Sequence, residues 1–121
     1  MPALNFQARF ADLVASGKKR QTIRPRRRHP IKAGDLLHLF TGMRTKRCKR
    51  LPSAQCRWAT PIRIEEWGFM VNTLIGTEEQ WKEPMLLNWF AVRDGFRDWA
   101  EMRQWFKKIH GLPFEGVLIA W

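Results

Sequence analysis

A short polar segment near the start of the chain carries side chains that can bind an anion or activate a hydroxyl. It reads Gly-Lys-Lys-Arg-Gln-Thr-Ile-Arg over residues 17–24. If residues 21–24 are extended, Thr22 and Arg24 project from one face, and Lys19 can fold over that face from the preceding turn. Arg24 would then hold a phosphate or a developing oxyanion. A lysine with a lowered pKa would deprotonate the Thr22 hydroxyl. The alternative is a solvated basic run followed by a strand-forming threonine.

Positive charge is concentrated in one third of the chain. The whole sequence carries a formal net charge of +11. Residues 18–57 hold fourteen Lys and Arg and one acid, which gives +13, whereas the other residues hold eight basic and ten acidic side chains. A polyanion would relieve the self-repulsion of such a cluster. The charge therefore favours an anionic partner over a merely solubilising surface. The basic side chains expected to contact it are Arg20, Arg24, Arg26, Arg27, Arg28, Arg44 and Lys46.

Length and composition limit the remaining possibilities. A chain of 121 residues that is 45% hydrophobic can build the core of one domain without disulfides. No stretch approaches the roughly 20 apolar residues of a membrane helix, and the first ten residues lack a secretory pattern. Cys48 and Cys56 have no accompanying histidine spacing of a zinc site. We expect free thiols, no metal or cofactor, no membrane partner and a cytoplasmic location.

Hydrophobic spacing and turn residues predict an order of elements. Apolar residues at positions 6, 10, 13 and 14 predict a helix that ends at Gly17. Strands are expected over 21–24, 36–41, 62–67 and 69–75, with a basic loop over 26–32 and a long loop or ragged hairpin over 43–55.

The C-terminal half is predicted to hold two helices before a last strand. Thr77 and Gln80 form a capping pattern, Pro84 marks a helix start, and Asp98 with Glu101 caps a helix over 99–109. Residues 114–121 are apolar on both faces, which predicts a central strand. The whole pattern favours an α+β domain over residues 1–121, with a mixed or closed sheet and helices at its ends.

The aromatic residues are divided between core and binding roles. Trp99, Trp105 and Phe106 follow helical spacing and are expected in the core. Trp67 stands at a strand end beside acidic residues and is the preferred candidate for stacking on a base, with Trp89 as another.

Several motifs together resemble the ASCH family. They are the G-x-K-x-x-T-x-R segment after a first helix, the Ile-Lys-Ala-Gly-Asp-Leu-Leu turn at 31–37, Phe-Ala-Val-Arg-Asp-Gly-Phe at 90–96, and the closing segment 114–121. The resemblance covers nearly the whole chain. The chain is similar to family members found in phages and prophages. It implies a small PUA-like β-barrel with flanking helices, and a cleft lined by the first motif. It also implies a role in RNA-related biology.

The resemblance suggests site residues and leaves three functions open. One branch of the family hydrolyses N4-acetylcytidine with Lys, Thr and Glu, which match Lys19, Thr22 and, with a shorter acid, Asp94. Another branch has ribonuclease activity. From its own residues, Asp94-Gly95 reads equally as a helix cap and turn. The leading hypothesis is a domain that binds RNA or a modified nucleoside in a basic cleft. The alternatives are such a hydrolase, and a phage or host protein-interaction factor with a basic face.

Overall fold

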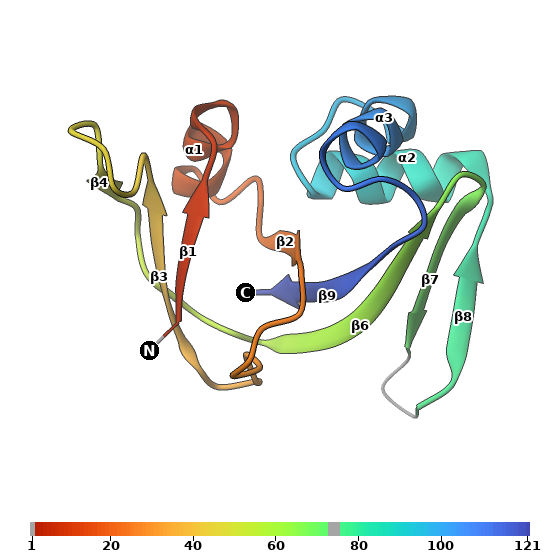
Figure 1. Cartoon of the computed structure of the whole chain (residues 1–121), viewed down its shortest axis with the longest axis horizontal. Helices are drawn as coiled ribbons and strands as arrows, with labels where there is room; N and C mark the ends of the chain where they lie inside the picture. Colours follow the sequence, from red (N-terminus) through yellow and green to blue (C-terminus); the bar gives the residue numbers. More distant parts are fainter. Residues whose placement is uncertain (1, 73–75) are drawn as a thin grey trace.

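The closing segment of the chain, β9 (Phe114–Ala120), lies inside the larger of two β-sheets in the computed structural model, which describes residues 2–72 and 76–121 (Figure 1). It pairs antiparallel with a strand on each side, which confirms the central strand expected from its apolar faces. The order is β2-β9-β6-β7-β8, so β2 lies at an edge. The other strands of this sheet are β2 (Gln21–Arg24), β6 (Trp58–Glu65), β7 (Gly68–Asn72) and β8 (Glu78–Trp81).

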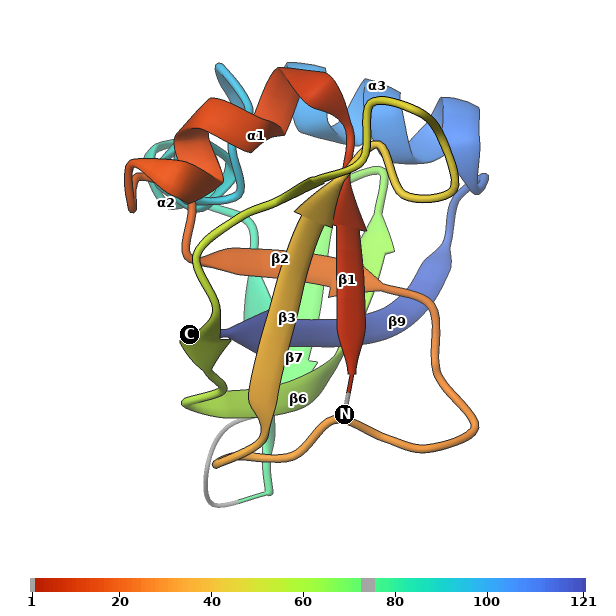
Figure 2. The same cartoon turned by 90° about the vertical axis from the view of Figure 1, so that its left-hand side faces the viewer.

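The smaller sheet is mixed. In it β1 (Ala3–Phe6) runs parallel to β3 (Leu36–Thr41), and two short strands, β4 (Lys49–Arg50) and β5 (Ala54–Gln55), pair antiparallel with β3. Figure 2 shows β1 and β3 crossing in front of β2, β9 and β6. Within residues 2–72 and 76–121 the strand pairings form these two sheets and do not close into one barrel.

Three helices lie at one end of the two sheets (Figures 1 and 2). They are α1 (Ala8–Ala15), α2 (Pro84–Arg93) and α3 (Trp99–Ile109). The Asp98 carboxylate accepts a hydrogen bond from the backbone N–H of Glu101 at 2.8 Å, which confirms the predicted cap of α3. One cluster of buried side chains includes residues from both sheets and all three helices. No helix in the described part of the chain is long and apolar enough to cross a bilayer.

Three details of the predicted element order are wrong. Phe6 belongs to β1 and not to the first helix, because Leu4 and Phe6 alternate as buried residues of a strand before α1 begins at Ala8. The capping pattern at 77–80 starts no helix, since residues 78–81 form β8 and pair with β7. Trp67 lies in the turn after β6, and of the expected strand 69–75, residues 73–75 lie outside the described residues.

Candidate functional site

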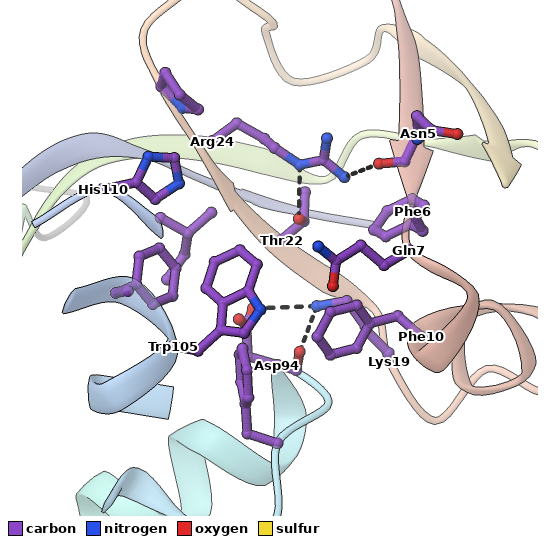
Figure 3. Close-up of a pocket in the computed structure, with 14 residues that line it drawn as sticks. Asn5, Phe6, Gln7, Phe10, Lys19, Thr22, Arg24, Asp94, Trp105 and His110 are labelled. Atoms are coloured by element: carbon purple, nitrogen blue, oxygen red, sulfur yellow. Dashed lines mark hydrogen bonds and ion pairs between the residues drawn. The ribbon is translucent and has the colours of Figure 1, made fainter. Parts of the chain in front are cut away.

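A cavity of about 250 Å³ lies along β2, with β1 and α1 on one side and α3 on the other (Figure 3). We call it the charged cavity because Lys19, Arg24 and Asp94 all line it. Thr22 lines it as well, so the structure brings together all three residues proposed for catalysis and the neighbouring arginine. The other lining residues are Asn5, Phe6, Gln7, Phe10, Ile23, Pro25, Phe96, Trp105, Phe106 and His110.

Lys19 and Asp94 form a buried ion pair in this cavity. Their side chains are 3% and 4% exposed, and 3.4 Å separates Lys19 Nζ from Asp94 Oδ1. Lys19 Nζ also donates a hydrogen bond to the backbone carbonyl of Asp94, 75 residues later in the chain. The interpretation of Lys19 as part of a solvated run is therefore wrong, although Lys18 and Arg20 on either side are exposed.

Burial dominates the acid–base behaviour of this pair. It lowers the pKa of Lys19, which Arg24 and Arg9 lower further, while Asp94 acts in the opposite direction. Burial likewise raises the pKa of Asp94, and the ammonium of Lys19 and a hydrogen bond from Gln21 partly offset that rise. The pKa values of the two groups are therefore closer together than those of a free carboxyl and a free amine.

The end of α2 holds Asp94 in place. Asp94 is the C-cap of the helix, and Gly95 follows with a φ of +96°, so the predicted cap and turn are both present. A Cβ at Gly95 would lie 2.9 Å from Phe10 Cδ1 and 3.0 Å from Lys19 Cδ. The structural and functional interpretations of Asp94 are thus compatible, because the same turn that ends α2 brings its carboxylate against Lys19.

Arg24 and Thr22 occupy the same face of β2, as predicted from their spacing. Arg24 Nε donates to Thr22 Oγ1 at 3.0 Å, and Arg24 Nη2 donates to the backbone carbonyl of Asn5 at 2.7 Å. The guanidinium also lies 4.8 Å from the centre of the Phe6 ring. Burial lowers the pKa of Arg24 to about 10, so the side chain remains cationic at neutral pH.

This arrangement supports two kinds of chemistry. Among the described residues Arg24 Nη1 has no hydrogen-bond partner, so the fixed guanidinium can donate to an anion or a carbonyl oxygen. Alternatively, an amine with a lowered pKa beside a threonine is the arrangement expected of a base and a nucleophile. The structure gives Lys19 two contacts with Asp94 and gives the Thr22 hydroxyl a contact with Arg24.

The other basic residues predicted to bind RNA lie outside this cavity and fall on separate surfaces. Arg26, Arg27 and Arg28 are exposed in the connection that precedes β3, whereas Arg44 and Lys46 are exposed in the turn that follows it. A six-residue strand spans roughly 20 Å, so the two groups sit at opposite ends of β3. The cluster that is continuous in sequence is thus divided in space.

Arg20 and Trp67 are also placed away from the cavity. Arg20 Nε donates to the backbone carbonyl of Trp121 at 3.1 Å, which ties the start of β2 to the end of the chain. Trp67 is 41% exposed, and its ring lies 5.9 Å from Lys82 Nζ. Trp67 is therefore available on the surface but does not join the residues that line the charged cavity.

Sequence reasoning missed part of the cavity wall. Trp105 was expected in the core, but it is only partly buried and lines the cavity together with His110 from the end of α3. Burial lowers the pKa of His110. Asn5 and Gln7 enter from the strand and helix start on the opposite side (Figure 3). Nothing in their local pattern marks them, because only the pairing of β1 with β3 brings them to β2.

The described residues hold no group of three or more His, Cys, Asp or Glu side chains placed to bind a metal ion. Cys48 is exposed, Cys56 is buried, and both are free thiols. Comparison of the chain with family models, with curated proteins and with solved structures finds no match.

Proposed function

We propose that the protein is an ASCH-type, PUA-like domain that binds RNA or a modified nucleoside. In this proposal the charged cavity receives an anionic or carbonyl oxygen of the ligand, and the exposed arginines before β3 contact the phosphate backbone. The resemblance of the segment 17–24 to the ASCH motif supports the assignment, since its Lys, Thr and Arg line one cavity.

The observation that carries the proposal is the fixed, partly unsatisfied guanidinium of Arg24. Two hydrogen bonds and the Phe6 ring hold it, so a ligand gains its remaining N–H donors with little loss of side-chain freedom. The net charge of the cavity is positive, because Asp94 offsets only one of the two cations that line it.

The exposed run from Arg26 to Arg28 extends this positive surface. It follows β2 directly, and the Arg27 charge is close enough to contribute to the lowered pKa of Arg24. A ligand oxygen at Arg24 would therefore be near a region where the remaining backbone phosphates meet exposed guanidinium groups. The arginine and lysine in the turn after β3, Arg44 and Lys46, would contact only a longer RNA, because β3 separates them from this run.

The proposal is tested by measuring binding of a labelled single-stranded RNA over a range of salt concentrations. We expect affinity to fall steeply with salt. The triple variant Arg26→Ser/Arg27→Ser/Arg28→Ser should reduce the logarithmic slope by about 2, because each phosphate that is no longer neutralised reduces it by roughly 0.7. The matched control removes three exposed charges elsewhere, in Lys82→Ser/Lys107→Ser/Lys108→Ser. It should leave the slope almost unchanged.

A second variant tests the cavity itself. Arg24→Gln should weaken RNA binding beyond the effect of one surface charge, because it removes a donor that is already positioned. Absence of RNA binding at low salt, or equal losses in the triple variant and its control, would contradict the proposal. Salt-dependent capture of an acidic protein in the absence of RNA binding would instead favour the interaction-factor alternative.

Hydrolysis is the second candidate, and the lowered pKa of the buried Lys19, which lines the same cavity as Thr22, favours it. Lys19 would take the hydroxyl proton, Thr22 Oγ1 would attack the acyl carbon of N4-acetylcytidine, and Arg24 would stabilise the oxyanion. The C–N bond would then break as the Lys19 ammonium returns the proton to the departing N4 amine of cytidine, with Asp94 as proton shuttle, and water would hydrolyse the acetyl-Thr22 ester to acetate. Acetate release is the measurement. We expect Thr22→Val to abolish it and Thr22→Ser to retain part of it, because serine keeps the nucleophile. No acetate from folded wild-type protein would exclude this substrate.

A further inference from the structure

A second cavity, of about 590 Å³, lies on the other side of β2. It lies between strands of the large sheet and α2, with Trp81 of β8 and Trp89 of α2 in its wall. We call it the tryptophan cavity. Its lining residues are Gln21, Trp58, Ala59, Thr60, Phe69, Val71, Asn72, Glu79, Trp81, Trp89, Phe90, Arg93 and Leu118.

Strand alternation explains why the two cavities differ. Gln21 points to the tryptophan cavity, whereas its neighbour Thr22 lines the charged cavity. Across the sheet, cross-strand pairs place Thr60 with Leu118 and Phe69 with Trp81 on the face of Gln21. Residues of five strands and one helix therefore line one continuous hollow.

Aromatic rings stand at both ends of this hollow. The Trp81 ring is stacked on Phe69 at 5.3 Å and 20°, and faces Trp89 at 6.3 Å and 16°. Trp58 lies at the start of β6, far along that strand from Ile64, which pairs with Phe69. The cavity is thus an elongated groove in which a flat ligand would meet an indole at either end.

The charges of the groove disfavour an ionic ligand. Its two charged residues have opposite sign, Glu79 and Arg93. The Arg93 guanidinium already lies 4.8 Å from the centre of the Trp89 ring. An anion would meet the Glu79 carboxylate and apolar walls, while a cation would meet Arg93. The remaining polar side chains, Gln21, Thr60 and Asn72, offer hydrogen bonds without charge.

We propose that the tryptophan cavity binds an uncharged, planar heteroaromatic ring with hydrogen-bonding edges, the chemistry of a nucleobase. The indoles of Trp81 and Trp89 supply stacking surface, and the uncharged amide and hydroxyl groups of the groove select a ring that carries donors and acceptors. This inference does not rest on the proposed function, because it concerns a different cavity and a ligand without phosphate.

One residue forms part of the wall between the two cavities. Gln21 Nε2 donates to Asp94 Oδ1 at 3.3 Å, and the same carboxylate oxygen pairs with Lys19 in the charged cavity. In the described part of the chain the Gln21 amide oxygen has no hydrogen-bond partner, which leaves it able to accept from a ring N–H. A base bound there would contact the group that orients Asp94.

The test is an NMR titration of the full chain with adenosine and cytidine, which carry no phosphate. The seven indole N–H resonances are followed and assigned with single variants. We expect shifts at Trp58, Trp81 and Trp89. Trp89→Ala should weaken binding roughly tenfold or more, given the usual contribution of a stacked base. Trp89 is 53% exposed, so its removal leaves the core intact.

Two matched controls make the result specific. Trp67→Ala removes another exposed indole that does not line the groove, and Lys108→Ser removes an exposed charge that lines neither cavity. Neither should change nucleoside affinity. The inference is overturned by an absence of shifts at millimolar nucleoside, or by binding that survives Trp89→Ala and Trp58→Ala. Binding lost in Arg24→Gln but kept in Trp89→Ala would also overturn it, because the nucleoside would then occupy the charged cavity.

A parallel titration with a dinucleotide shows whether the bound base belongs to RNA or to a free nucleoside. Tighter binding of the dinucleotide than of the nucleoside, still dependent on Trp89, assigns the groove to a base within RNA. Equal affinity assigns it to a free nucleoside. The proposed function can fail separately, since salt-dependent binding to Arg26–Arg28 is measured with a polyanion and not with the uncharged nucleosides.

Discussion

The charged cavity and the tryptophan cavity share the strand β2 but differ in the interactions that stabilise their residues. In the first, a buried amine and a buried carboxylate are stable only because each has the other, at 3.4 Å. In the second, indoles and phenyl rings contact one another without such a requirement. Gln21 and Thr22 are neighbours in β2 but line different cavities. We expect the charged cavity to be destabilised when either ion-pair partner is removed, and the tryptophan cavity to tolerate single substitutions.

The largest expected effect comes from removing one charge of the buried pair. Asp94→Asn keeps the side-chain size but leaves Lys19 without its counter-ion, so we expect about 3–5 kcal/mol less stability. Urea unfolding followed by circular dichroism measures it. A comparable truncation in the other cavity, Trp89→Ala, should cost far less because that ring is half exposed.

The double variant Lys19→Met/Asp94→Leu is the matched control for this prediction. It replaces both charges by apolar groups of similar size, and such replacements in buried pairs are often neutral or stabilising. We therefore expect it to be more stable than Asp94→Asn. Equal instability of the two variants would show that packing at this position, and not the unpaired charge, sets the cost.

A smaller effect is expected where the two cavities meet. Gln21→Leu removes the hydrogen bond to the Asp94 carboxylate while keeping a side chain of similar volume. Hydrogen bonds to charged groups contribute about 1.5–3 kcal/mol, which is the expected loss in unfolding free energy. In the Lys19→Met/Asp94→Leu background the same change should cost little, since the charged acceptor is gone. An equal cost in both backgrounds would mean that Gln21 acts through packing alone.

The contrast also explains how much the sequence could reveal. The charged cavity contains one segment, 17–24, in which spacing alone predicts a strand with Thr22 and Arg24 on one face. Asp94-Gly95 is marked by its turn chemistry. The burial of Lys19 could not be predicted, because it depends on Asp94 from a helix 75 residues away and on Phe10 from α1. Local charge patterns instead favoured solvent exposure for the whole basic run.

The tryptophan cavity was beyond local reasoning. Its rings come from β6, β7, β8 and α2, and except for Phe90, which begins the 90–96 motif, none of them forms a motif with its sequence neighbours. The strand β8 was missed because Thr77 and Gln80 fit a helix cap, while pairing with β7 decided the outcome. The position of Trp67 at a strand end favoured it for stacking, with Trp89 as another candidate. Of these two residues only Trp89 lines the groove, together with Trp58 and Trp81, whose cross-strand positions only the register reveals.

The smallest effect that we predict is a pH dependence at the charged cavity. Its direction distinguishes ligand binding from hydrolysis. Burial lowers the pKa of Lys19, so its proton is lost within a range below the usual value for an amine. If the cavity binds an anionic oxygen, affinity falls as pH rises through that range, since the protonated form is the donor. If Lys19 is a base for Thr22, turnover rises over the same range, because only the free amine accepts a proton.

The measurement is RNA affinity and acetate release from pH 7 to pH 9. In that window Arg24, with a pKa of about 10, keeps its proton, and His110, whose pKa burial lowers, is already neutral. As Lys19 loses its proton, we expect affinity to decrease by about 1 kcal/mol, the contribution of one hydrogen bond, and Lys19→Met/Asp94→Leu to abolish the trend. The tryptophan cavity provides the internal reference: adenosine affinity should not change, since Lys19 does not line that cavity. A parallel loss of RNA and adenosine affinity would indicate a general change in the fold and not titration at Lys19.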